Sequence, residues 1–87
     1  MSKYKVFFKS WADRQLRKLP DALQRRIVGE LETLAHNPRP RGVVKLAGHE
    51  NLWRIRVGDY RVLYEIYDDR LVILVLRLAR RKDVYRP

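Results

Sequence analysis

Three strands are predicted in the second half of the chain from its pattern of apolar and polar residues. Apolar and basic residues alternate over residues 52–57 and 60–66, and Gly58-Asp59 stands between these two runs. A two-residue turn containing Gly between alternating runs is typical of a β-hairpin, because Gly adopts the positive φ that such turns need. The nearly continuous apolar run over residues 71–78 predicts a third strand, covered on much of both faces.

The predicted hairpin has one apolar face and one basic face. If Val57 pairs with Tyr60, the basic face carries Arg54, Arg56 and Arg61, with Arg56 directly opposite Arg61. Like charges directly across a strand pair are destabilising, so this face predicts an anionic partner. A solvated basic face remains the alternative, because charged residues are ordinary on an open antiparallel sheet. The apolar face would consist of Trp53, Ile55, Val57, Tyr60, Val62, Tyr64 and Ile66.

The first half of the chain predicts one strand and two helices. A β-branched and aromatic run over residues 4–9 is followed by Ser10, a predicted helix N-cap with Asp13 as capping-box acid. Pro20 interrupts the helical pattern, and a second helix is predicted over residues 21–36. A stiff, basic, Pro-containing loop, a short strand over residues 43–46 and a second loop lead into the hairpin. The apolar stripe of the second helix is Leu23, Ile27, Leu31, Leu34 and Ala35.

The register of the last strand depends on the turn before it. A two-residue turn at Asp68-Asp69 would place Arg77 in the core. A three-residue turn that includes Arg70 would place Arg77 beside Arg61. We prefer the longer turn because a buried, unpaired Arg is costly. The core residues of the strand would then be Leu74, Leu76 and Leu78.

Composition narrows the class of protein. A length of 87 residues predicts a single domain, residues 1–87. The net charge of +10 favours nucleic acid, an acidic protein or an anionic membrane surface as partner. The absence of Cys excludes a disulfide framework, a thiolate nucleophile and a zinc-finger ligand set. No long apolar run begins the chain, so we expect neither a signal peptide nor a membrane span, and a cytoplasmic location.

Two stretches of the chain resemble the RelE/ParE toxin superfamily. They are LAGHENLWRIRVGDYRVLYEI (residues 46–66) and LVILVLRLARRKDVYR (residues 71–86). The likeness runs through essentially the whole chain and is to the RelE branch, whose members cut messenger RNA in the ribosomal A site. It implies an α+β, RelE-like domain: an N-terminal strand and a two-helix hairpin packed on a mainly antiparallel, four- to five-stranded twisted sheet. A short C-terminal turn or helix would close the chain.

The resemblance also implies an active site without metal or cofactor. Its basic residues and C-terminal Tyr correspond to Arg54, Arg56, Arg61, Arg81 and Tyr85. A ribose 2′-hydroxyl would attack the adjacent phosphodiester, while Arg61 binds the phosphate, Arg81 stabilises or protonates the leaving oxygen, and Tyr85 stacks on a base or exchanges a proton. Further RNA contacts are expected from Arg39, Arg41, Lys45, Arg77, Arg80 and Lys82.

Two departures from the family pattern bear on the chemistry. Many relatives have Lys at the positions of Arg54 and Arg56, and a guanidinium effectively never loses its proton, so the general base is left open. Relatives often have Gly-His-Arg where this chain has Ala-Arg-Arg at residues 79–81. His36 and His49 are expected at the surface, and Trp11 either in the core or on an antitoxin-binding surface.

The family implies a cognate antitoxin, the ribosome and messenger RNA as partners, with operator DNA bound through the toxin-antitoxin complex and no membrane. The expected function is therefore a ribosome-dependent endoribonuclease toxin that inhibits translation. Two alternatives stay open: a gyrase-inhibiting toxin like those of the ParE branch, and a module that binds RNA or antitoxin without cleavage.

Overall fold

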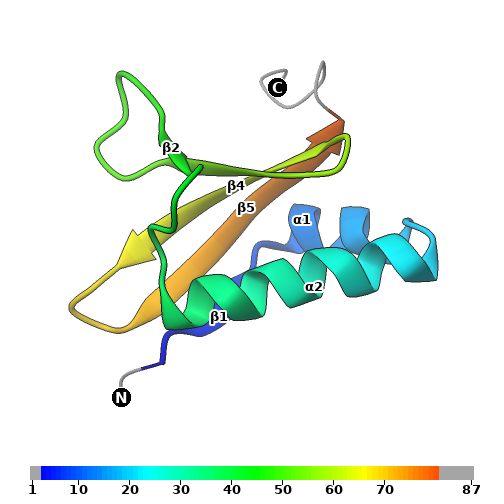
Figure 1. Cartoon of the computed structure of the whole chain (residues 1–87), viewed down its shortest axis with the longest axis horizontal. Helices are drawn as coiled ribbons and strands as arrows, with labels where there is room; N and C mark the ends of the chain where they lie inside the picture. Colours follow the sequence, from blue (N-terminus) through cyan, green and yellow to red (C-terminus); the bar gives the residue numbers. More distant parts are fainter. Residues whose placement is uncertain (1–2, 81–87) are drawn as a thin grey trace.

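Two helices cover one face of a five-stranded sheet in the computed structural model, which describes residues 3–80 (Figure 1). The strand order is β1-β5-β4-β3-β2; β1 runs parallel to β5, and the other neighbours are antiparallel. The predicted α+β class and mainly antiparallel sheet are confirmed, whereas the predicted C-terminal turn or helix lies outside the described residues. The elements are β1 (Lys5–Phe8), α1 (Ser10–Arg17), α2 (Asp21–His36), β2 (Val44–Lys45), β3 (Trp53–Val57), β4 (Tyr60–Tyr67) and β5 (Val72–Arg80).

The β3–β4 hairpin has the predicted register. Val57 lies opposite Tyr60 and Arg56 lies opposite Arg61. Gly58 has a φ of +59°, in the left-handed region that tight turns use. A Cβ at this position would also lie 3.4 Å from a guanidinium nitrogen of Arg26, on α2. The turn therefore needs Gly for its backbone conformation, whereas a Cβ would meet Arg26 only at an ordinary contact distance.

The turn between β4 and β5 differs from the prediction. Four residues, 68–71, connect the strands, and Leu71 adopts the left-handed conformation with a φ of 53°. Tyr64 pairs with Val75, but the residue before it on β4, Leu63, pairs with Arg77. The residue between them, Leu76, has no partner on β4 and forms a β-bulge. A bulge adds one residue to one strand and so changes which residues of that strand share a face.

The bulge explains why part of the predicted register is correct. Before it, Ile73 and Val75 are fully buried among the core residues. After it, Leu78 is buried and Arg77 shares a face with Arg61, as predicted. The prediction that Leu74 and Leu76 lie in the core is wrong, because both are only half-buried. One extra residue lets the strand bury Ile73 and Val75 without burying Arg77 in the core.

The helices begin and end close to the predicted positions, but their first turn is capped differently. Ser10 is the first residue of α1 and not its N-cap. The N-cap is Lys9, whose backbone N–H donates to the Val75 carbonyl of β5 (2.9 Å), and no side chain caps the helix. Asp13 forms an ion pair with Arg17 (3.1 Å) instead of a capping box. Pro20 separates the helices as predicted. No helix within residues 3–80 is long and apolar enough to cross a bilayer.

The core lies between the helices and the sheet, and the predicted stripe of α2 supplies one side of it. Of that stripe, Leu23 packs at the margin and the other four residues are buried. Each fully buried aliphatic side chain contributes about 1.5–3 kcal/mol relative to an exposed one. The residues buried in this core are Ala12, Ile27, Leu31, Leu34, Val57, Val62, Tyr64, Ile66, Ile73, Val75 and Leu78.

Side-chain hydrogen bonds fix the two loops that border the hairpin. The buried Tyr64 hydroxyl donates to the Pro38 carbonyl of the Pro-containing loop (3.0 Å). The Asn51 amide donates to the Ile66 carbonyl (2.7 Å), and its oxygen accepts from the Ile66 N–H (3.3 Å) and from the Trp53 indole (3.2 Å). Asn51 thus extends the β3–β4 ladder by one side chain, and these bonds hold the loops against the strands that carry the arginines.

Candidate functional site

The sheet face turned away from the helices, here called the open face, carries a cluster of arginines from three strands. One row across the sheet is Arg54, Leu63 and Arg77, and the next row is Arg56, Arg61 and Ala79. Neighbouring strands lie about 4.8 Å apart, so adjacent members of a row are close enough to act on one ligand. The predicted placement of Arg54, Arg56 and Arg61 on one face is confirmed, and Arg77 joins them.

Arg61 occupies the middle of this cluster and is the most enclosed cation on the open face. Only 9% of it is exposed, whereas Arg56, across the strand pair, is exposed to solvent. Leu63 and Ala79 are buried on either side of this region and pack with Leu46 and Leu52. Arg61, which lies opposite Ala79, therefore borders a small apolar cluster, and its guanidinium keeps its charge. Such surroundings strengthen its attraction for an anion, because water screens the charge less.

Arginines in this arrangement suit a phosphate group. The planar guanidinium donates two parallel hydrogen bonds to an anion, and several such groups around one phosphate stabilise the charge that develops during phosphoryl transfer. The Arg56 Nε donates to the Gly58 carbonyl (3.4 Å), which orients this side chain toward the hairpin turn. Within residues 3–80, no group of three or more His, Cys, Asp or Glu side chains is arranged to hold a metal ion. His36 and His49 are exposed, as expected.

Of the predicted RNA-binding residues before β3, Arg39 and Lys45 contact other side chains of the protein. Both terminal nitrogens of Arg39 bind the Asp68 carboxylate (2.9 and 3.2 Å), and its guanidinium carbon lies 5.1 Å from the centre of the Trp53 ring. Lys45 Nζ lies 5.7 Å from the same ring, while Arg41 is exposed. The sequence analysis missed this cluster because its members are far apart in the chain, and half-buried Trp53 offered no sign of flanking cations.

Charge and hydrogen bonding couple the members of this loop cluster. The Arg39 guanidinium, followed by the Tyr4 hydroxyl that also donates to Asp68, holds the pKa of the Asp68 carboxyl below its ordinary value. The same ion pair raises the pKa of Arg39, and the hydrogen bond to Asp68 raises that of Tyr4. Arg39 thus ties the Pro-containing loop to the turn between β4 and β5.

Arg80 lies apart from the other predicted site residues. It pairs with Tyr60, whose side chain is on the helix-covered side of the sheet, and so Arg80 faces away from Arg61. The positions of Arg81, Lys82 and Tyr85 lie outside the described residues, and their roles stay predictions.

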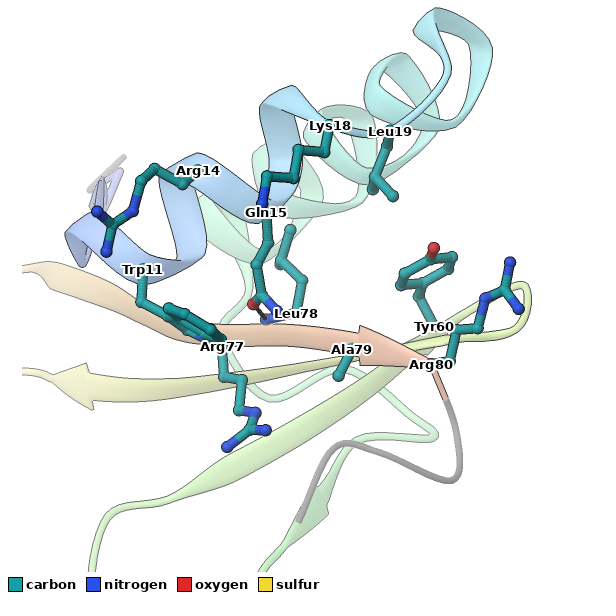
Figure 2. Close-up of a pocket in the computed structure, with 10 residues that line it drawn as sticks. All are labelled: Trp11, Arg14, Gln15, Lys18, Leu19, Tyr60, Arg77, Leu78, Ala79 and Arg80. Carbon is teal, nitrogen blue, oxygen red and sulfur yellow. Dashed lines mark hydrogen bonds between the residues drawn. The ribbon is translucent and has the colours of Figure 1, made fainter. Parts of the chain in front are cut away.

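A cleft beside α1 brings Arg77 and Arg80, two of the predicted RNA-binding residues, together with residues that the sequence analysis did not assign to an RNA site (Figure 2). It has a volume of about 310 Å³ and lies between α1 and the last residues of β5. Helical spacing offered a signal, because Trp11, Arg14 and Lys18 recur every three or four residues and so share one side of the helix. Trp11 is 52% exposed, which excludes the core position and leaves the surface position of the two that the sequence analysis considered. The charged and aromatic lining residues are Trp11, Arg14, Lys18, Tyr60, Arg77 and Arg80.

Comparison with known proteins relates the sequence and the fold of this chain to toxins. The family model described as ParE toxin of type II toxin-antitoxin system, parDE, matches residues 6–85. Toxin RelG of Mycobacterium tuberculosis is 32% identical over 84 residues, which cover 95% of this chain and 97% of RelG. Toxin RelE of the same organism is 33% identical over 84 residues, covering 95% of this chain and 87% of that protein.

Solved structures agree with these matches. A chain in the crystal structure of the archaeal RelE-RelB complex from Pyrococcus horikoshii superposes with a TM-score of 0.81 and 34% identity, covering 98% of this chain and 99% of that one. A chain of the RelBE2 toxin-antitoxin complex from Mycobacterium tuberculosis gives a TM-score of 0.79 and 32% identity, over 95% and 97% of the two chains. The chain therefore belongs to the RelE/ParE family of toxins of type II toxin-antitoxin systems.

Proposed function

We propose that this protein is a ribosome-dependent endoribonuclease that cleaves messenger RNA in the A site and so inhibits translation in the cytoplasm. The observation that carries the proposal is the position of Arg56 directly opposite Arg61, with Arg54 on the same face of the sheet. Like charges placed across a strand pair reduce stability, and a bound phosphate would remove that repulsion. A net charge of +10 also favours association with ribosomal and messenger RNA.

The proposed reaction transfers a phosphoryl group within the RNA. The ribose 2′-oxygen attacks the adjacent phosphorus, the bond to the 5′-oxygen breaks, and the products are a 2′,3′-cyclic phosphate and a free 5′-hydroxyl. Arg61 binds the non-bridging oxygens, and Arg54 and Arg56 stabilise the charge that grows on them. Positioning the 2′-oxygen in line with the leaving group supplies the remaining acceleration.

In this proposal, proton transfer is carried out by groups other than Arg54 and Arg56. A guanidinium does not accept a proton near neutral pH, which excludes Arg54 and Arg56 as general bases. Arg81 is assigned to the leaving 5′-oxygen, and Tyr85 is assigned either to stacking on a base or to proton transfer through its hydroxyl.

A cognate antitoxin is the proposed protein partner, and the toxin-antitoxin complex is proposed to bind its operator DNA. The solved complexes from Pyrococcus horikoshii and Mycobacterium tuberculosis that superpose on this chain contain RelE-type toxins with RelB antitoxins. An acidic antitoxin segment that neutralises the arginines of the open face would hold the toxin inactive. Opposite charges would also speed its association.

Primer extension on a short messenger RNA positioned in ribosomes tests the proposal. Wild-type protein is expected to cut in the A site, and Arg61→Ala to cut at least about 100-fold more slowly, because a single transition-state donor contributes about that factor. Arg25→Ala, on the exposed side of α2, is the matched control for loss of one positive charge. The proposal is wrong if the wild type makes no cut, or if a folded Arg61→Ala protein cuts at the wild-type rate.

Inhibition of DNA gyrase is a second candidate function, because the matching family model is described as a ParE toxin. A supercoiling assay with purified gyrase distinguishes the two. Inhibition that persists in Arg61→Ala, together with uncut messenger RNA, would favour the gyrase function.

A further inference from the structure

The cleft beside α1 exists because β5 is longer than its outer neighbour. β1 ends at Phe8, opposite Val75, and β5 continues to Arg80. The outer edge of β5 after Val75 has no strand beside it within the described part of the chain, and α1 crosses that edge. Gln15 of α1 accepts a hydrogen bond from the Leu78 N–H (3.1 Å). A side chain of α1 thus bonds to the outer edge of β5 in place of a neighbouring strand, and the cleft lies between α1 and β5.

The chemistry of the cleft is cationic and aromatic. Its lining includes four basic side chains and no acidic one among the described residues. Trp11 exposes 52% of its surface, although Trp is usually well buried, and Tyr60 stands at the other end (Figure 2). Aromatic side chains stack on nucleic-acid bases whatever the sequence, and basic side chains bind the phosphates between them. The four cations are Arg14, Lys18, Arg77 and Arg80.

Arg77 connects the cleft with the open face. It lines the cleft, and it also lies opposite Leu63 in the row that ends at Arg54. In Figure 2, Arg77 points to the side of the sheet away from α1, whereas Arg14 extends sideways from the helix. Positive charge therefore continues from the open face, around the edge of β5, to α1. No acidic residue of the lining interrupts this path.

We propose that the cleft binds a nucleotide of single-stranded RNA that flanks the phosphate held on the open face. The base stacks on Trp11, and the adjoining phosphates bind Arg14 and Lys18. The inference rests on the proposed RNA-cleaving function of the open face and adds a second subsite to it. A peptide segment of an antitoxin would find no backbone partner at the Leu78 N–H, because Gln15 already occupies it.

Binding of a short 2′-O-methyl RNA tests the subsite without cleavage, because the blocked 2′-oxygen does not attack. The affinity of a fluorescent 12-nucleotide probe is measured by anisotropy over a range of KCl concentrations. Trp11→Ala is expected to weaken binding about tenfold with little change in salt dependence, because stacking contributes about that much for one base. Arg14→Gln/Lys18→Gln is expected to lower the slope of log affinity against log salt by about 1.4, since each phosphate contact on a single strand contributes about 0.7.

Lys5→Gln/Arg25→Gln is the matched control. It removes the same charge from exposed positions on β1 and α2 that do not line the cleft. Its affinity is expected to stay within about threefold of wild type, because neither side chain lines the cleft and salt screens exposed charges. The cleft variants change exposed side chains, and near-ultraviolet circular dichroism confirms that each protein is folded.

The outcomes separate the subsite from the proposed function. The subsite is wrong if wild type does not bind the probe, or if the cleft variants bind it as tightly as the matched control. It is also wrong if they bind RNA normally but escape neutralisation by the cognate antitoxin, which would assign the cleft to that protein. Trp11-dependent binding by a wild type that cuts no ribosome-bound messenger RNA would support the subsite and overturn the nuclease.

Discussion

The helix-covered face and the open face of the sheet use the same strands, yet they hold different kinds of side chains. On β4, Val62 and Tyr64 point to the helices and are fully buried, whereas Arg61 and Leu63 point to the open face. On the covered side, apolar burial and paired polar groups stabilise the fold. On the open side, Arg56 lies against Arg61, a pairing that reduces stability.

The difference shows how a small domain separates folding from binding. Strand alternation gives one face to the core, and every second residue is free to vary for another purpose. Each buried aliphatic side chain contributes about 1.5–3 kcal/mol, whereas an opposed pair of like charges costs about 0.2–1 kcal/mol. The stabilisation from the buried core therefore exceeds the cost of placing arginines opposite one another on the open face.

Deleting Val62 should have the largest effect on stability, because the side chains of half of β4 would then point to the opposite face of the sheet. Residues on one side of the deletion would move to the opposite face, which would expose Tyr64 or bury Arg61 among the core residues. Either result removes a large part of the about 5–15 kcal/mol that stabilises a typical domain. We expect an unfolded protein by circular dichroism and by the loss of dispersed amide resonances.

Deleting Leu76 is the matched comparison. This residue is the extra one of the bulge, so its loss leaves Tyr64 opposite Val75 and Leu63 opposite Arg77. We expect a folded protein whose β5 is straighter and whose Arg77 is displaced, since bulges add local twist. A deletion of Leu76 that unfolds the chain as completely as the deletion of Val62 would show that the bulge is required for folding.

Arg56→Ala should separate activity from stability. The proposed cleavage rate should fall at least about 100-fold, equivalent to about 2.7 kcal/mol of transition-state stabilisation. The free energy of unfolding should stay unchanged or rise by up to about 1 kcal/mol, because the repulsion with Arg61 is relieved. Urea denaturation and primer extension measure the two effects, and Arg56→Lys serves as control for charge. A large loss of stability would mean that Arg56 supports the fold.

Most of the covered face was predictable from the sequence, because alternation and helical spacing are local signals. The hairpin register follows from the Gly58 turn, and the buried stripe of α2 follows from a period of 3.6 residues. The arginines of the open face were predictable for the same reason, since they occupy the remaining positions of the same strands.

The rest depends on contacts between distant segments. The bulge at Leu76 allows Ile73 and Val75 to lie in the core while Arg77 lies on the open face. No local sequence pattern predicts this bulge. The ion pair of Arg39 with Asp68 joins residues 29 positions apart. The cleft beside α1 depends on the relative lengths of β1 and β5, which only their pairing reveals.

Tyr64→Phe should destabilise the covered face by about 1–2 kcal/mol, because it leaves the Pro38 carbonyl without its buried hydrogen bond. Burial raises the pKa of the Tyr64 phenol. The unfolded chain then ionises above about pH 10 while the folded chain keeps the proton, so wild-type stability should fall as the pH rises beyond 10. Tyr64→Phe should lack this part of the alkaline loss, and Tyr60→Phe is the comparison on the same strand. Equal alkaline slopes for wild type and Tyr64→Phe would contradict the assignment.

The smallest effect is expected at Asp68, whose carboxylate joins the loop over the covered face to the turn between β4 and β5. Its pKa is lowered first by the Arg39 guanidinium and then by the Tyr4 hydroxyl. As the pH falls below about 4, the Asp68 carboxylate is therefore protonated first in the unfolded state. The contribution of Asp68 to the free energy of unfolding is then lost progressively, until the pH has passed the lower pKa of the folded state. Melting temperatures between pH 5 and about 2 should fall less for Asp68→Asn than for wild type.

Asp69→Asn is the control, since the Asp69 carboxylate lies 3.8 Å from Arg70 Nε, in an exposed pair. Because the Asp68 side chain is 57% exposed, salt should reduce the difference, and a difference unchanged in high salt would mean that the effect is not electrostatic.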